Sequence, residues 1–171
     1  MIFKRGIFGF DGHSSNLQRS LDKLRLKRPT LSDSGGLNCI MILSCLFIAD
    51  SPGRGRGVFT NKDLTTGKLI EVSPVIVMNN DERKLLDQTL LHDYIFLWGK
   101  TENECCVGLG YLSIYNHDFH SNAEYEMDFE LSVIRIKTVR NIKKAEEIFI
   151  NYNGSWNDSK PLWFDPVKGL K

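Results

Sequence analysis

The residues whose types and spacing could do chemistry lie in four short segments between residues 55 and 152. In the first, two glycines flank Arg56, and the missing side chains permit close approach of the main chain to a ligand; a plain hairpin turn is the alternative. One such segment is common by chance, whereas four in order are a specific signal. The segments are Gly55-Arg56-Gly57-Val58-Phe59, Gly67-Lys68-Leu69-Ile70-Glu71 running on to Pro74, Tyr115-Asn116-His117 followed by Ser121-Asn122-Ala123, and Ala145-Glu146-Glu147-Ile148-Phe149-Ile150-Asn151-Tyr152.

Metal chemistry has little support in the sequence. Asp118 and His120 follow His117 in an H-D-x-H pattern, which offers three ligands and no fourth. The cysteines show no C-x-x-C spacing, so a zinc ribbon is unsupported. We therefore expect no metal site, and we expect structural or buried free thiols at the four cysteines, which are Cys39, Cys45, Cys105 and Cys106.

Carboxylates alternate with apolar side chains from Glu124 to Leu131, which predicts a strand with one acidic face and one apolar face. Such an acidic face is usually only solvated. The functional alternative is that it attracts a cationic partner, such as a peptide rich in Lys and Arg. The acidic residues are Glu124, Glu126, Asp128 and Glu130.

The composition is that of one globular domain. The chain has 171 residues, and its 42% hydrophobic and 25% charged residues exclude a chain that is disordered throughout. A net charge of +1 gives the whole molecule no basic footprint for nucleic acid. This average conceals a division: residues 1–37 hold seven Lys or Arg against three Asp, a charge of +4, so the remainder carries −3.

The segment 1–37 is rich in Gly and Ser and has only weak apolar periodicity. We therefore expect a flexible basic extension there, with one marginal helix over 16–27. A solvated tail is the favoured interpretation, and a nuclear address or a nucleic-acid contact is the alternative. The apolar run 37–49 is too short to cross a bilayer and too far from Met1 for an ordinary secretory signal. We therefore predict an intracellular protein, cytoplasmic or nuclear, with no membrane partner.

Short segments of strand character, broken by Gly, Pro and Asn, predict a mostly β domain with one or two helices. A helix is expected over 81–91, because Asn79 or Asn80 can cap it and Leu85, Leu86 and Leu90 give it one apolar face. The strands are expected at 40–48, 57–60, 69–78, 94–98, 124–137 and 148–152.

Taken in this order and at these spacings, the four segments resemble the SET domain of protein lysine methyltransferases. The match is to the compact SET proteins without flanking zinc modules. It implies a SET fold of small curved β-sheets with a knot-like C-terminal crossing, in which Asn116-His117 threads under a loop near Tyr152. We expect a SET domain over 38–165, the extension at 1–37, and a C-terminal tail at 166–171.

The resemblance implies S-adenosylmethionine as cofactor. The main chain of Gly55, Arg56 and Gly57 would bond its polar end, and Asn116 would contact its amino acid end. The backbone around His117 would receive the adenine amino group, which gives that histidine a positional role and no acid–base role. Trp163, with Phe164, resembles an aromatic closure over the adenine, and a simple hydrophobic anchor is its alternative.

The resemblance also assigns Tyr152 to catalysis, because the family's tyrosine at the end of this segment lies where the lysine amine meets the methyl group. Four residues are candidates for the walls of the lysine channel: Tyr94, Phe96, Tyr125 and Ile150. Core packing is the alternative for each aromatic. Ile150 is a departure, since the family often has Phe or Tyr there, and Ala145 in place of Gly is another. A third departure is the run 118–121, which stands where the family usually has Ser-Cys and then Pro before the second Asn.

The function implied is transfer of a methyl group from S-adenosylmethionine to a lysine of a basic protein, such as a histone tail. The alternatives are a catalytically inactive SET-like module that binds a basic peptide, and an enzyme that methylates a small amine. Nucleic acid is expected as a partner only through the basic extension.

Overall fold

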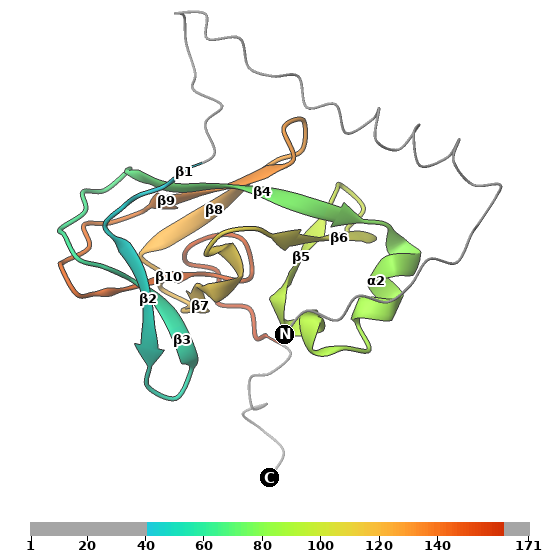
Figure 1. The fold of residues 1–171 in the computed structure, drawn as a ribbon, viewed down its shortest axis with the longest axis horizontal. Coiled ribbons are helices and arrows are strands. Elements are labelled where there is room, and N and C mark those ends of the chain that lie inside the picture. Colours follow the sequence, from blue (N-terminus) through green and yellow to red (C-terminus); the bar gives the residue numbers. More distant parts are fainter. Residues whose placement is uncertain (1–40, 163–171) are drawn as a thin grey trace, which may run out of the picture. The chain divides into compact units, whose positions relative to one another are not determined.

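The computed structural model describes residues 41–162, which belong to one compact unit. The predicted extension at 1–37, Cys39, Trp163 and the tail at 166–171 lie outside the described residues. The described part is mostly β, as predicted, and consists of two sheets with one short α-helix and two 3-10 helices (Figure 1). No helix among residues 41–162 is long and apolar enough to cross a membrane.

The first sheet has the strand order β5-β6-β4-β9-β8. The short strand β1 pairs with the first half of β4, at Glu71 and Val72, whereas β6 pairs with its second half. All of its strand pairs are antiparallel. The predicted strand at 69–78 is confirmed as β4, a Val- and Ile-rich strand that runs through the whole sheet (Figure 1). The strands are β1 (Met41–Ile42), β4 (Leu69–Met78), β5 (Ile95–Trp98), β6 (Glu104–Gly108), β8 (Ala123–Asp128) and β9 (Val133–Thr138).

The second sheet brings the first, third and fourth segments together. Its order is β2-β3-β10-β7, with strands β2 (Leu46–Ser51), β3 (Gly55–Thr60), β10 (Glu147–Ile150) and β7 (Asn116–His117). The pair β7 and β10 is parallel, with Asn116 opposite Phe149 and His117 opposite Ile150. Asn122 ties the same region together, because its amide donates to the carbonyl of Glu147 and accepts from the amide of Phe149. The knot-like crossing stays a prediction.

The helix is shorter than predicted. It is α2 (Asn80–Leu86), and Asn79 caps it in a reciprocal capping box with Glu82. The chain then turns at Asp87 and forms the 3-10 helix η1 (Leu90–Tyr94) in place of the expected last turn of α2. Because α2 buries none of its residues and Leu85 is 67% exposed, the expected apolar packing face does not form.

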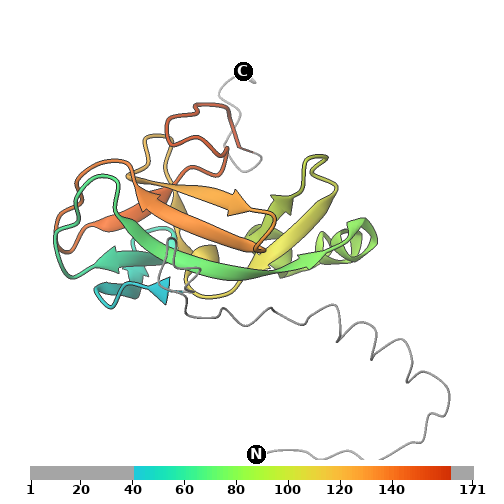
Figure 2. The ribbon, with the colours of Figure 1, turned by 90° about the horizontal axis from the view of Figure 1, so that it is seen from above.

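Two predicted strands are each interrupted by a turn. The segment 40–48 divides into β1 and β2, with a turn closed by the bond from the amide of Leu46 to the carbonyl of Leu43. The segment 124–137 is a hairpin of β8 and β9 (Figure 2), because the carboxylate of Asp128 accepts from the amides of Glu130 and Leu131 and closes a turn. Glu130 therefore lies in the turn and not on the strand face. Strand β6 was not predicted.

The core lies between the sheets and holds the strands that lead into the candidate site. Ile148 and Ile150 of β10 are fully buried, as are Val58 of β3 and Ile70 of β4. Burial of such aliphatic side chains contributes about 1.5–3 kcal/mol each. The end of β10, where Tyr152 follows, is thereby fixed against the rest of the domain.

Candidate active site

Tyr152 is held at both its backbone and its hydroxyl. Its amide donates to Nδ1 of His117 at 3.1 Å, and its hydroxyl donates to the backbone carbonyl of Tyr115 at 2.9 Å. Burial raises the pKa of Tyr152, although the positive charge of Arg54 opposes that shift. The hydroxyl is therefore protonated near neutral pH and is a fixed hydrogen-bonding group.

Two cavities meet at this tyrosine. The cavity that we call the aromatic cavity has a volume of about 510 Å³, and the one that we call the polar cavity has a volume of about 730 Å³. Both volumes are within the range of small-molecule sites. The residues that line both cavities are Asp93, Tyr94, Ser113, Tyr115 and Tyr152. A ligand in one cavity and a ligand in the other would therefore approach each other beside Tyr115 and Tyr152.

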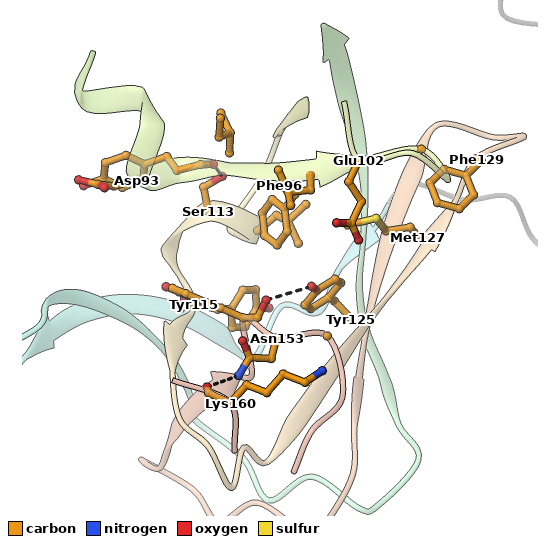
Figure 3. Close-up of a pocket in the computed structure, with 17 residues that line it drawn as sticks. Asp93, Phe96, Glu102, Ser113, Tyr115, Tyr125, Met127, Phe129, Asn153 and Lys160 are labelled. Atoms are coloured by element: carbon orange, nitrogen blue, oxygen red, sulfur yellow. Dashed lines mark hydrogen bonds between the residues drawn. The ribbon is translucent and has the colours of Figure 1, made fainter. Parts of the chain in front are cut away.

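The aromatic cavity has ring faces on several sides (Figure 3). Phe96 and Tyr125 pack edge to face, with ring centroids 5.5 Å apart. The hydroxyl of Tyr125 makes a long hydrogen bond of 3.5 Å to the carbonyl of Tyr152, and burial raises its pKa. Tyr94, from η1, completes the set of predicted aromatics that line this cavity. An apolar stem with a cationic or neutral amine at its end suits such walls.

The polar cavity is lined by the first and third segments. The amide nitrogen of Asn116 donates to the carbonyl of Arg56 at 3.1 Å and to the carboxylate of Glu147 at 2.7 Å. Both of its hydrogens are thus used within the protein, which fixes the amide and leaves Oδ1 as an acceptor. Gly57 permits this arrangement, because a Cβ there would lie 2.1 Å from a carboxylate oxygen of Glu147 and 3.0 Å from Nδ2 of Asn116.

The residues of the polar cavity fit an amino acid joined to a flat aromatic base. The fixed Oδ1 of Asn116 can accept from an ammonium group, and the guanidinium of Arg56 can meet a carboxylate. The rings of His117 and Phe119, with centroids 4.5 Å apart, offer aromatic surface. The guanidinium of Arg54 donates to the carbonyl of His117 and lies 5.0 Å from the ring centroid of Phe149.

Most of the sequence-predicted residues line these cavities, and two do not. Gly55, Arg56, Asn116, His117 and Tyr152 line the polar cavity, while Tyr94, Phe96, Tyr125 and Tyr152 line the aromatic cavity. Gly57 is buried and does not line the polar cavity, but it lies next to the side chain of Asn116, which does. Ile150 lines neither cavity, because its strand, β10, lies between β3 and β7 and its side chain is fully buried in the hydrophobic core.

The acidic strand face lies beside basic residues. On β9, Arg135 stands opposite Glu126, Lys137 stands opposite Glu124, and Arg135 forms an ion pair of 2.9 Å with Asp128. Tyr125 and Met127 of β8, and Phe129 of the turn that follows, line the aromatic cavity. The predicted alternation of faces is therefore confirmed over β8 and ends at the turn. The acidic face therefore points away from that cavity.

Sequence reasoning missed several residues of the site. Asp93 and Glu102 are the carboxylates that line the aromatic cavity, on opposite sides of it (Figure 3). Tyr115 was noted only as the neighbour of Asn116, and Ser113 had no signal at all. In the H-D-x-H pattern, the carboxylate of Asp118 accepts from the amide of His120. Within residues 41–162, no three His, Cys, Asp or Glu side chains are grouped as metal ligands.

Comparison with known proteins identifies the family. The model of the SET domain matches residues 55–153. A Schizosaccharomyces pombe histone-lysine N-methyltransferase, H3 lysine-37 specific, is 34% identical over 126 residues, which are 73% of this chain and 80% of that protein. The chain belongs to the SET-domain family. Its class of activity is that of a protein-lysine N-methyltransferase.

Solved structures agree with this fold. A Plasmodium falciparum protein described as a candidate histone methyltransferase superposes with a TM-score of 0.51 and 29% identity, over 65% of this chain and 99% of that one. A chain of the Chaetomium thermophilum Polycomb repressive complex 2, bound to S-adenosylmethionine, superposes with a TM-score of 0.55 and 19% identity. That match covers 63% of this chain and 15% of the other, and it concerns the fold alone.

Proposed function

We propose that this protein transfers a methyl group from S-adenosylmethionine to the side-chain amine of a lysine in a basic protein, with histones as the first candidates. The observation that carries the proposal is the meeting of two cavities of different chemistry beside Tyr152. The cofactor would occupy the polar cavity and the lysine would enter through the aromatic cavity. Histones are favoured because the S. pombe relative is a histone-lysine methyltransferase.

In the polar cavity, the chain would hold the two ends of the cofactor. Oδ1 of Asn116 would accept from its ammonium group, while Arg56 and the main chain near Gly55 would meet its carboxylate. Phe119 and the backbone of His117 would lie near its adenine. When bound, S-adenosylmethionine supplies a methyl group on a positively charged sulfur, which makes that carbon open to attack by a neutral amine.

In the aromatic cavity, the chain would favour the neutral lysine amine. Free lysine has a pKa of about 10.4, so its deprotonation at pH 7 costs about 4.6 kcal/mol. Removal of the amine from water in an apolar cavity disfavours its charged form, as does a neighbouring cation, and both lower the pKa of the amine. Tyr94, Phe96 and Tyr125 provide that environment here. The departing proton would leave toward the solvent at the cavity mouth.

At the junction, Tyr152 and Tyr115 would orient the reacting amine. The hydroxyl of Tyr152 is fixed on the carbonyl of Tyr115, and both residues line both cavities. Their oxygens can accept a hydrogen bond from the amine and make weak C–H···O contacts with a polarised methyl group. Holding the two reactants in line is itself a large contribution to such a displacement.

The carboxylates at the aromatic cavity favour a basic substrate. Asp93 and Glu102 are exposed and lie on opposite sides of it (Figure 3), so a peptide with positive charges on both sides of the target lysine would meet opposite charge.

If histones are the substrate, the protein works in the nucleus. This assignment agrees with the intracellular location expected from the sequence.

The proposal is tested by incubating the protein with labelled S-adenosylmethionine and purified core histones. We expect label on lysine, located by mass spectrometry, and we expect its loss in Tyr152→Phe. Tyr111→Phe is the matched control, because Tyr111 lines neither cavity. Absence of transfer by the wild-type protein to histones or to other basic proteins would refute the proposal, as would full activity of Tyr152→Phe.

The alternative function is a module that binds a basic peptide without catalysis. It is separated from the proposal by calorimetry with S-adenosylmethionine alone, since a pure peptide-binding module has no need of the cofactor. We expect binding that is weakened by Asn116→Ala. Peptide binding without any cofactor binding would favour the alternative.

A further inference from the structure

Glu71, in β4, is a fully buried carboxylate that the proposed chemistry does not use. One of its oxygens accepts from the hydroxyl of Ser73 at 2.6 Å and from the amide of Tyr111 at 3.0 Å. The other oxygen accepts from the hydroxyl of Tyr115 at 2.7 Å. A buried carboxylate is costly unless donors surround it. Here the donors are neutral, and within residues 41–162 no ion pair involves Glu71.

The donors belong chiefly to one short stretch, residues 110–115, which contains the 3-10 helix η2 (Leu112–Ile114). Gly110 enters this stretch with φ of +101°, and a Cβ there would lie 2.8 Å from the carboxylate of Glu71 and 2.5 Å from the hydroxyl of Ser73. The stretch therefore approaches Glu71 as closely as a glycine allows. The carboxylate of Glu71 holds the stretch near both of its ends, because it accepts from the amide of Tyr111 and from the hydroxyl of Tyr115.

Tyr115 connects this anchor to the candidate catalytic residue. It is 1% exposed, its hydroxyl is bonded to Glu71, and its carbonyl accepts from the hydroxyl of Tyr152 at 2.9 Å. The same stretch supplies Ser113 and Tyr115 to the wall that both cavities share. A shift of the stretch would move the oxygen that fixes Tyr152.

We propose that Glu71 is a positioning residue for methyl transfer: its carboxylate fixes residues 110–115, so that the carbonyl of Tyr115 holds the hydroxyl of Tyr152 at the junction of the two cavities. The inference rests on the proposed function. Glu71 lines neither cavity, so it acts through Tyr115 and not by contact with a substrate.

The electrostatics of the site agree with an anchor that is held by hydrogen bonds. Burial raises the pKa of Glu71, and the bonds from Ser73, from Tyr115 and from the backbone amides of residues 111 and 112 act against that rise. Tyr115 has a pKa well above the usual value, first through burial and then through the charge of Glu71. A tyrosine with a raised pKa keeps its hydroxyl proton, which agrees with Tyr115 as the donor of the hydrogen bond to Glu71.

The first test separates positioning from binding by kinetics. Glu71→Gln keeps the size of the side chain and removes one acceptor oxygen, while Tyr115→Phe keeps the backbone carbonyl and removes the donor. We expect each to lower kcat by about tenfold, with the KM values for peptide and cofactor changed by less than about twofold. Both substitutions remove the same hydrogen bond, between the Tyr115 hydroxyl and the Glu71 carboxylate. The kcat of the double variant should therefore lie within about twofold of the kcat of the slower single variant.

The control is Thr138→Val, which removes a buried hydroxyl that bonds the carbonyl of Thr65, far along β9 and outside both cavities. It should lose stability without a tenfold loss of kcat. Wild-type kcat in both Glu71→Gln and Tyr115→Phe would overturn the inference, and so would a double variant whose losses multiply. If Glu71→Gln does not fold, Tyr115→Phe and the control decide the outcome.

A second readout does not depend on methyl transfer. In protein labelled with ¹³C at Cζ of tyrosine, the signal of Tyr152 is assigned by its loss in Tyr152→Phe. We expect this signal to shift in Glu71→Gln and in Tyr115→Phe, and to stay in place in Thr138→Val. An unshifted signal in both variants would overturn the inference even if the wild-type protein methylated no histone, whereas a shifted signal with an inactive wild type would refute the proposed function alone.

Discussion

Replacement of Gly57 by alanine should weaken cofactor binding although Gly57 does not line the polar cavity. The new Cβ would lie 2.1 Å from Oε1 and 2.8 Å from Cδ of Glu147, both far inside van der Waals contact. The carboxylate must therefore move by about 1 Å or more to restore an ordinary contact. It cannot do so without disturbing the side chains bonded to it.

The magnitude follows from those bonds. Glu147 accepts from the hydroxyl of Ser51 at 2.8 Å and from the amide of Asn116 at 2.7 Å. Hydrogen bonds to a charged group contribute about 1.5–3 kcal/mol each, and overpacking alone costs about 1–3 kcal/mol. Since Glu147 is only half-buried, water can replace part of what is lost. We expect Gly57→Ala to lower the free energy of unfolding by about 2 kcal/mol.

The loss of cofactor binding is transmitted through Asn116. Once Glu147 is displaced, the Arg56 carbonyl is the one hydrogen-bond acceptor left for this amide within residues 41–162, so Oδ1 is held less firmly for the ammonium group. We expect the Kd for S-adenosylmethionine to rise about tenfold by calorimetry, which corresponds to about 1.4 kcal/mol. Urea denaturation measures the stability separately.

Gly55→Ala is a control for stability alone, since Gly55 itself lines the polar cavity; a Cβ there meets no atom within 4 Å and only its φ of +79° is strained. It should cost about 1 kcal/mol of stability, without the clash on Glu147. In the double variant Gly57→Ala, Glu147→Ala, the stability losses should fall short of additive, because the clashing carboxylate is gone. Wild-type stability and cofactor affinity in Gly57→Ala would refute the reasoning.

Three further predictions follow from the charges and the buried thiol. Arg54→Ala should raise the pKa of Tyr152 further, because Arg54 is the charge that lowers it, and tyrosine Cζ shifts followed against pH will show whether it does. Burial raises the pKa of Cys106 to about 12, so its thiol should resist alkylation at pH 8 until the protein is unfolded, as peptide mapping can show. A turn amide and then Arg135 hold the pKa of Asp128 below its unfolded value of about 3.9, so the stability that this carboxylate adds is present above about pH 4 and is lost as the pH falls further. The stability difference between the wild type and Asp128→Asn should therefore shrink below that pH, and a difference independent of pH would contradict this assignment.

The sequence predicted the elements that depend on local pattern. Strand β4 was predicted with its observed bounds because Val and Ile fill it. A cap at Asn79 or Asn80 was predicted from residue type alone, and the structure has it at Asn79. The hairpin of β8 and β9 was predicted as one strand, because alternation continues through the turn and only the side chain of Asp128 closes it. Short 3-10 helices leave no periodic signal, so η1 and η2 were missed.

The site was predictable as a set of residues and not as an arrangement. Asn116 and Tyr152 were identified from their segments, but the parallel pairing of β7 with β10 joins residues far apart in sequence and has no local signature. Gly57 was assigned to the cofactor, whereas in the structure the space left by its missing side chain is filled by the carboxylate of Glu147. Ile150 was assigned to the channel wall, although the inward face of β10 takes it into the core.

The arrangement also explains why the segments function only together. The amide of Asn116 is oriented by a carbonyl of the first segment and a carboxylate of the fourth. The ring of His117 accepts from the backbone amide of Tyr152, and the hydroxyl of Tyr152 donates to the carbonyl of Tyr115. Each of these three side chains is thus held by a residue of another segment. A change in any one of them should reach both cavities, because none of the three is positioned by its own strand alone.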